Sequence, residues 1–161
     1  MKLSTLNDLY VEELQDLYSV ESQILKALPD MVKAATAPDL KAGFEAHLRQ
    51  TQEHVSRLEQ ICDKLGKSPR GKHCKGMEGI LAEGKELLKE KSEPEVLDAG
   101  LITAAQHVEH YEIAGYGTVR TYAKLLGETE AAALLQRTLD EEEQTDQKLT
   151  QLSTKINVEA L

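Results

Sequence analysis

Apolar residues recur at alternating spacings of three and four along most of this sequence, which is the period of one face of an α-helix. Residues 40–65 keep this spacing without a break. Four long segments carry the pattern, and Gly and Pro residues typical of turns separate them. Aromatic residues make up only 4% of the chain, whereas strands favour aromatic and β-branched side chains. The sequence therefore predicts an all-α protein rather than a sandwich or a barrel.

Capping signals and breakers set the expected ends of the first two long helices. Thr5 followed by Asp8 is typical of a helix start, so the first helix is expected over about residues 5–35. Pro29 lies inside this helix, and we expect a kink there because the apolar stripe continues past it. The second long helix is expected from about residue 38 to Gly66, a residue type that commonly ends helices.

The middle of the chain, residues 66–93, differs from the rest because glycine, proline and basic residues crowd into its first half. One short helix is expected there, over about residues 77–89. Ser92 to Glu95 matches a capping box with Pro94 near the first helical position, so the third long helix should run from there to Gly127. The last long helix should begin near residue 128 and continue almost to the end of the chain.

The lengths of the connections predict how the helices are arranged. The first and second long helices are joined by a short turn, as are the third and fourth, so each pair should form an antiparallel hairpin. The connection between the hairpins is long enough to cross the bundle. Two hairpins joined by one long crossover is the ferritin-like arrangement. At 161 residues, we expect a single domain spanning residues 1–161.

Polar residues interrupt or flank the apolar stripes near the middle of each long helix. The midpoints of helices in antiparallel hairpins meet at one height, so these side chains should gather at one level of the bundle. Burying unpaired carboxylates costs roughly several kcal/mol each. A cation that neutralises them is therefore predicted. The residues are Glu21, His47, His54, Glu109, Glu112, Glu142 and Asp146.

The donor types favour iron or manganese over other metals. Carboxylates with one or two imidazoles suit these ions, and several acids could neutralise a pair of divalent cations. Zinc prefers tetrahedral sites built from nitrogen and sulfur, and Ca²⁺ usually binds loops with a different spacing. A zinc site from Cys62, His73 and Cys74 would lack a fourth ligand. The sequence therefore predicts a centre of iron or manganese and does not choose between the two.

Each polar residue also has an ordinary structural explanation. A lone His47 or His54 is more often a hydrogen-bonded core residue than a metal ligand, and His54 has the weaker claim of the two. Glu141 and Glu143 flank Glu142 in an acidic run and are expected on a solvated face. The metal prediction rests on the convergence of residues from all four long helices.

Composition excludes or disfavours several functional classes. The formal net charge of −9 argues against nucleic-acid binding, which depends on clustered Lys and Arg. No apolar run is long enough to predict a transmembrane helix, and no signal region is expected at the amino terminus. Cys62 and Cys74 are expected to stay reduced in the cytoplasm. Tyr111 and Tyr116 are expected to be packing residues.

Several segments match a known group of proteins, most specifically in the third and fourth long helices. The sequence resembles the YciE/YciF family of ferritin-like bacterial stress proteins over nearly the whole chain. That resemblance implies a ferritin-like bundle with two added short helices, usually dimeric, with a di-iron centre and a role in stress. The family is often labelled a ferroxidase. The matching segments are Glu21-Ser22-Gln23 with Lys26-Ala27-Leu28-Pro29, His47-Leu48 with Thr51, Cys74 with Met77-Glu78-Gly79, Ala104 to Thr118, and Thr138 to Glu142 with Thr145-Asp146 and Lys148-Leu149-Thr150.

The chain departs from the resemblance at one proposed ligand position. The family commonly carries Glu where this chain has Gln50, and an amide is a poorer metal ligand than a carboxylate. The two expected consequences are weaker metal binding or the recruitment of His54. The wider ferritin-like pattern, Glu-x-x-His, is also replaced here by Glu142 with Asp146 and by His47 with Gln50.

These observations support two main functional hypotheses. In the leading one, the chain is a cytoplasmic di-iron or di-manganese carboxylate protein that handles ferrous iron with O₂ or peroxide under stress. Glu21, Glu112 and Glu142 would bind the metal, Glu109 and Asp146 would bridge or complete the site, and His47 would supply an imidazole. In the alternative, the bundle is a structural or interaction protein whose metal site has degenerated, and Gln50 in place of a glutamate is the sign of that loss. A storage cage is a third, less favoured possibility.

Overall fold

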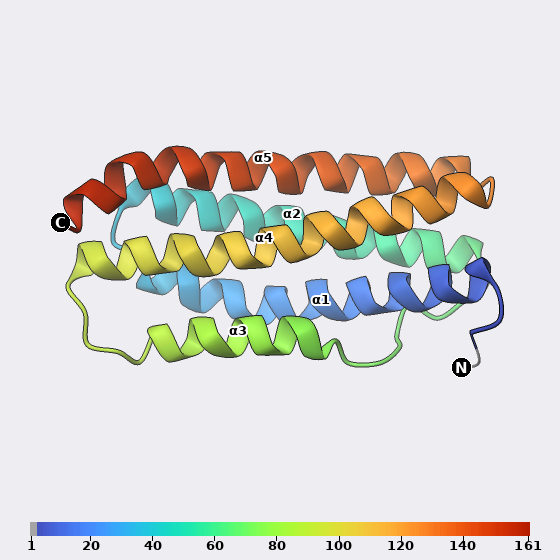
Figure 1. Ribbon diagram of the computed structural model, residues 1–161, viewed down its shortest axis with the longest axis horizontal. Helices are drawn as coiled ribbons and strands as arrows, with labels where there is room; N and C mark the ends of the chain where they lie inside the picture. The colour runs from blue at the N-terminus through green and yellow to red at the C-terminus, as the bar shows by residue number, and fades with distance from the viewer. Residues whose placement is uncertain (1–2) are drawn as a thin grey trace.

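Four long helices lie side by side in the computed structural model, which describes residues 3–161 (Figure 1). The described residues contain helices and no strand, so the all-α prediction is confirmed. The short helix α3 lies outside the four long ones, along α1 and α4 (Figure 1). The helices are α1 (Leu6–Ala34), α2 (Pro38–Lys64), α3 (Lys75–Leu87), α4 (Pro94–Leu125) and α5 (Thr129–Glu159).

The predicted hairpins and crossover are also confirmed. The most extensive contacts of the bundle are those of α4 with α5, followed by those of α1 with α2. The chain crosses between the hairpins through residues 65–93, which include α3 (Figure 1). The two added short helices implied by the family resemblance are not both seen, because residues 3–161 contain one short helix, α3.

Local capping explains some of the helix ends. Thr5 Oγ1 accepts a hydrogen bond from the Asp8 backbone nitrogen at 3.1 Å, and Asp8 Oδ2 accepts one from the Thr5 nitrogen at 2.9 Å. This capping box begins α1 as predicted. The helix continues through Pro29. Gly66 and Gly127 follow the ends of α2 and α4 with φ of +64° and +79°, a left-handed conformation that glycine adopts without a steric penalty.

The capping box predicted at Ser92 to Glu95 is wrong. Glu93 occupies the N-cap position of α4, and no side chain among residues 3–161 caps that helix end, although Pro94 does begin the helix. The first turn of a helix leaves backbone N–H groups without partners, and a capping side chain would accept a hydrogen bond from one of them. Pro94 has no N–H, so α4 has one fewer such donor.

A buried carboxylate from α4 holds the turn between α1 and α2. Asp98 is 2% exposed and accepts hydrogen bonds from the Thr36 nitrogen at 2.8 Å, the Thr36 hydroxyl at 2.6 Å and the Ala37 nitrogen at 2.7 Å. These bonds satisfy backbone donors next to the start of α2, which has no side-chain cap of its own among the described residues. The Asp98 side chain on α4 therefore links the second hairpin to the turn of the first by three hydrogen bonds.

The apolar core of the described residues divides into two clusters, one on each side of a polar layer. One cluster includes Ile24, Phe44, Ala105 and Leu149. The other includes Leu17, Leu58, Tyr116 and Leu139. On every long helix, the polar interruption lies between residues that belong to different clusters. Six of the seven predicted polar residues, all except Asp146, thus gather at one level within the bundle.

The crossover is tied to α1 by side-chain hydrogen bonds. Gln15 Nε2 donates to the Ser68 carbonyl at 2.8 Å, Gln23 Nε2 donates to the Cys74 carbonyl at 3.0 Å, and the Cys74 nitrogen donates to Ser19 Oγ at 2.9 Å. Cys74 and Cys62 are buried free thiols. Within the described residues, neither thiol belongs to a group that could hold a metal ion.

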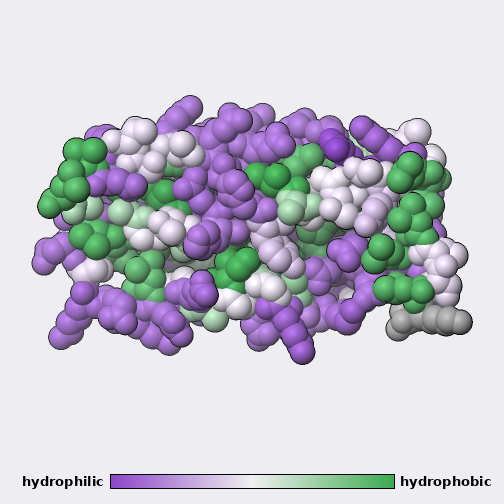
Figure 2. Space-filling view, viewed as in Figure 1, coloured by the Kyte–Doolittle hydropathy of each residue, from purple (hydrophilic) through white to green (hydrophobic). Residues whose placement is uncertain are grey.

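Hydrophilic side chains cover much of the face shown in Figure 2, and apolar patches interrupt them, including at both ends of the bundle. None of the helices in the part of the chain that the structure describes is long and apolar enough to cross a membrane.

Replacing Asp98 with alanine should lower the free energy of unfolding by about 2–4 kcal/mol, because three donors lose a charged acceptor inside the protein. Urea denaturation monitored by circular dichroism measures this. The control is Asp30→Ala, which removes an exposed acid from α1 and should change the value by less than about 0.5 kcal/mol. Equal stability of the Asp98→Ala and Asp30→Ala variants would show that the turn does not depend on Asp98.

Candidate metal centre

Six acidic and imidazole side chains from all four long helices meet inside the polar layer. Every one of them is between 0% and 4% exposed. They lie where the heptad-like stripe faces the bundle axis, so the same periodicity that builds the helices aims these groups inward. They are Glu21 of α1, His47 and His54 of α2, Glu109 and Glu112 of α4, and Glu142 of α5.

The six residues form two overlapping groups whose potential ligand atoms lie within 4.8 Å of one another. One group consists of His47, Glu109, Glu112 and Glu142, and the other of Glu21, His54 and Glu142. Glu142 belongs to both. A carboxylate has two oxygens, so it can serve two neighbouring cations at once.

The two imidazoles approach Glu142 from successive positions on α2. His54 Nδ1 lies 2.9 Å from Glu142 Oε1 and 3.4 Å from Glu21 Oε1. His47 Nδ1 lies 3.9 Å from Glu142 Oε2, and its Nε2 lies 3.2 Å from Glu109 Oε1. Each histidine therefore faces two carboxylates, one of which is shared.

Most of the polar atoms in this layer lack a hydrogen-bond partner. Eleven buried side-chain nitrogen and oxygen atoms have no partner within residues 3–161, and nine of them belong to the six residues. Both oxygens of Glu112 and both ring nitrogens of His47 are among the nine. Native proteins rarely leave buried polar atoms unpaired, and unpaired groups concentrated at one place indicate an ion or a ligand. The donor set therefore fits a bound cation.

Burial and mutual repulsion shift the pKa values of this layer. Burial, followed by the nearby charge of Glu142, raises the pKa values of Glu109 and Glu112 well above the ordinary range. Burial lowers the pKa of His47, which keeps the imidazole neutral. Burial also opposes the charge on His54, but the adjacent carboxylates of Glu142 and Glu21 outweigh it and raise the pKa of His54 to about 10. The side chains of the protein therefore do not supply enough positive charge to neutralise all of these carboxylates.

A second row of side chains holds His54 from outside the cluster. Glu141 Oε2 lies 2.9 Å from His54 Nε2 and accepts a hydrogen bond from Arg57 Nη1 at 2.7 Å. Arg57 also donates to Thr138 at 2.9 Å. Burial opposes ionisation of Glu141, but the hydrogen bonds from Arg57 and His54 lower its pKa to about 2. With Nε2 engaged, Nδ1 of His54 is directed at Glu21 and Glu142, as is common for histidines that bind metals.

Sequence reasoning missed this outer row. Glu141 was expected on a solvated face, yet its side chain is only 19% exposed. Arg57 was not singled out, although it follows His54 by three residues and so lies on the same side of α2. That spacing is the signal that could have found it.

Tyr116 contributes more than packing to the same layer. Its hydroxyl donates a hydrogen bond to Glu21 Oε1. Burial raises the pKa of Tyr116 well above its usual value, so the phenol remains a donor. Its ring also meets the His54 ring edge-on, with centroids 6.2 Å apart. Tyr116 therefore fixes one oxygen of Glu21 and leaves the other, Oε2, without a partner among residues 3–161.

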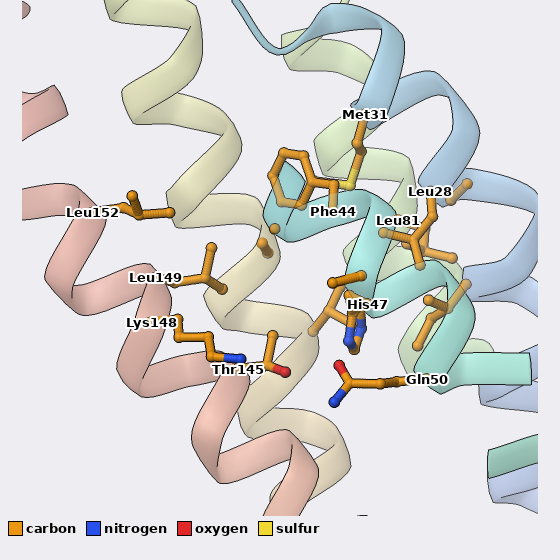
Figure 3. Close-up of a pocket in the computed structure, with 16 residues that line it drawn as sticks. Leu28, Met31, Phe44, His47, Gln50, Leu81, Thr145, Lys148, Leu149 and Leu152 are labelled. Carbon is orange, nitrogen blue, oxygen red and sulfur yellow. The ribbon is translucent and has the colours of Figure 1, made fainter. Parts of the chain in front are cut away.

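The structure places two of the sequence-predicted ligands outside both groups. Asp146 is partly exposed and contacts Gln106 Nε2 at 3.1 Å and His110 Nε2 at 3.3 Å. Gln50 is half-buried and lines a cavity next to His47 (Figure 3). His54, which had the weaker claim from the sequence, lies in the centre of the layer. The roles of Asp146 and Gln50 as ligands stay predictions.

Comparison with known proteins places this architecture in a family. A family model described as "Domain of unknown function (DUF892)" matches residues 5–161. The chain belongs to this family. It is 43% identical over 155 residues to Protein YciF of Escherichia coli (strain K12), which covers 95% of this chain and 93% of that protein. The family resemblance seen in the sequence is thereby confirmed.

Several solved structures share the fold. The crystal structure of the E. coli stress protein YciF matches with a TM-score of 0.92 at 40% identity, covering 96% of this chain and 98% of that one. YcfI from Rhodopseudomonas palustris matches with a TM-score of 0.90 at 41% identity, covering 92% and 95%. The ferritin-like fold is confirmed by the first of these matches. A protein from Xanthomonas campestris shares the fold at 21% identity, with a TM-score of 0.77 and coverage of 96% and 94%.

Replacing Glu112 with methionine should stabilise the metal-free protein by about 1–3 kcal/mol, because a buried carboxyl without partners gives way to an apolar side chain of similar size. Urea denaturation in the presence of a chelator measures this. Asp98→Met is the matched contrast, since that buried carboxylate is fully paired and its loss should destabilise. A large loss of stability in Glu112→Met would instead mean that Glu112 belongs to a hydrogen-bonded network.

Proposed function

We propose that this DUF892 protein binds two metal ions of the iron class in the six-residue layer and oxidises ferrous iron with O₂ or peroxide. The observation that carries the proposal is the set of nine unpaired buried atoms arranged around the shared Glu142. The description of the E. coli relative as a stress protein supports a role in stress response. Manganese is the alternative metal.

The balance of charge supports two divalent ions. The layer contains four carboxylates, from Glu21, Glu109, Glu112 and Glu142. Two divalent cations would match four negative charges, and oxygen-rich sites with one or two imidazoles suit iron and manganese. Iron would supply one-electron redox chemistry at the site. Oxidation of two ferrous ions as substrate releases two electrons, which with two protons reduces one O₂ to hydrogen peroxide.

The protein side chains have separable tasks in this proposal. His47, Glu109 and Glu112 would bind one metal ion, and Glu21 and His54 would bind the other. Glu142 belongs to both groups. Glu141 and Arg57 orient His54, and Tyr116 orients Glu21 through its hydrogen bond. The apolar clusters above and below exclude water and keep the polar groups at one level.

A structural role is the second candidate, and the position of two residues favours it. Gln50 and Asp146 lie outside both groups, so fewer protein ligands face the metals than the sequence predicted. A bundle with such a degenerate site would act as a structural or interaction protein. The resemblance also implies a homodimer, and light scattering of the purified protein would measure the oligomeric state.

Anaerobic loading of the metal-free protein with ferrous iron, followed by desalting, should leave about two iron ions per chain. The Glu112→Gln/Glu142→Gln variant should retain little iron, with its helix content unchanged by circular dichroism. Glu45→Gln/Glu143→Gln is the matched control, because both of its acids are exposed on α2 and α5. Iron content in the buried-acid variant equal to that of the control would exclude this site.

Metal binding should also raise the thermal midpoint, because the ions bind the native state only. At a free metal concentration about 100 times Kd, the midpoint should rise by roughly 5–10 °C. Differential scanning calorimetry with and without iron measures the change. The structural alternative predicts the same midpoint in both samples.

Glu141→Gln should weaken metal affinity by about 10–100-fold while leaving the number of ions bound at saturation unchanged, because it acts only by orienting His54. Competition with a coloured chelator measures the affinity. The control is Glu143→Gln, two residues further along α5 and exposed. If Glu141→Gln and Glu143→Gln bind metal equally well, the outer row has no influence on the site.

A further inference from the structure

A mostly apolar cavity lies directly against the His47 side of the polar layer (Figure 3). Its volume is about 70 Å³, and residues of all five helices line it. Leu81 comes from the short helix α3, so the crossover helps to close the cavity. The apolar part of the wall includes Ile24, Leu28, Phe44, Ala105, Val108 and Leu149.

The polar groups of the cavity are few and gather on one side. Figure 3 shows His47, Gln50 and Thr145 converging between α2 and α5, with Lys148 beside Thr145. His47 is 4% exposed, and both of its ring nitrogens lack a hydrogen-bond partner among residues 3–161. The same imidazole belongs to the first metal-ligand group. The cavity and the proposed metal centre therefore share a side chain.

Gly43 contributes to the cavity by lacking a side chain. It lies within α2, where glycine is less favourable than alanine by about 1 kcal/mol. Neither backbone nor packing requires glycine here: its φ is not positive, and an added Cβ would meet no atom within 4 Å in the described residues outside its own helix backbone and chain neighbours. A larger residue at position 43 would extend into space that the cavity now occupies.

We infer that this cavity admits and holds a small apolar molecule of the size of dioxygen on its way to the metal centre. This inference rests on the proposed function and identifies the oxidant that the site accepts. Sites for drug-sized ligands occupy about 300–1,000 Å³, so 70 Å³ suits a molecule of a few atoms. The apolar part of the wall offers water no hydrogen-bond partner and accepts uncharged, weakly polar guests.

The same walls discriminate against the other candidates. Hydrogen peroxide would lose hydrogen bonds to water wherever it meets the apolar part of the wall, and a hydrated ferrous ion would lose far more. The cavity therefore favours O₂ over peroxide as the oxidant, and the metal must reach the layer by another path.

The first test uses xenon, an apolar atom that does not react with iron. Crystals of the metal-free protein pressurised with xenon should show an anomalous peak between Phe44, Ala105 and Leu149. Gly43→Phe should abolish the peak, and Gly79→Phe should keep it, because Gly79 is exposed on α3 with nothing within 4 Å of an added Cβ in the described residues. Absence of xenon from this cavity in the unmodified protein would overturn the inference, whatever the protein does with iron.

The second test measures the reaction itself. After anaerobic loading with ferrous iron, Gly43→Phe should react with O₂ at least tenfold more slowly than Gly79→Phe, with the same iron content per chain and a much smaller change in its rate with peroxide. Ala46→Leu narrows the same cavity from the next turn of α2 and replaces Gly43→Phe should that variant fail to fold. Equal O₂ rates would exclude this route. Failure of the unmodified protein to bind iron would instead reject the proposed function, while the xenon result would still decide whether the cavity takes small apolar guests.

Discussion

A layer of buried carboxylates in the middle of the bundle is the constraint on which the rest of the structure depends. An unpaired buried polar group costs about 1–3 kcal/mol, and a typical domain is stable by only about 5–15 kcal/mol. Even the two unpaired oxygens of Glu112 therefore represent a substantial part of such a stability. The two apolar clusters and the ties made by Asp98 offset that cost and keep the helices in register. Ordinary core packing would not retain such a layer, whereas binding a cation would.

The two imidazoles of the layer are not equivalent, and their surroundings explain why. His54 is held on its outer side by Glu141, which Arg57 fixes in turn. His47 has no comparable outer partner within residues 3–161 and borders a cavity instead. The His54 side is thus hydrogen-bonded to charged groups, and the His47 side borders a mostly apolar cavity. A centre that must hold ions firmly and still admit a reactant needs both kinds of surroundings, and α2 supplies them from positions seven residues apart.

The helical period in the sequence predicted much of this arrangement, because one repeated pattern specifies both the helices and the face that they bury. It indicated the inner positions of Glu21, Glu109, Glu112 and Glu142 before any contact was known. It could not predict which of two neighbouring acids would turn outward to hold a histidine, since Glu141 and Glu142 differ by a rotation of the helix and by their long-range partners. The role of Asp98 was missed for a similar reason: its bonds span more than 60 residues of sequence, and local capping rules consider only a few. Asp146 follows Glu142 by one turn, but its carboxylate accepts a hydrogen bond from Gln106 and lies beside His110, partners on α4 that the local pattern could not predict.

Stability and metal affinity are linked in this bundle by the same repulsion. Each carboxylate that destabilises the metal-free protein raises the free energy of the state from which binding begins, so it increases the gain when a cation arrives. A change that relieves repulsion stabilises the empty bundle and weakens binding at once. Paired groups such as Asp98 have no such double effect, because their partners are supplied by the chain. The opposite responses of paired and unpaired buried acids therefore distinguish residues that serve the fold from residues that serve a bound ion.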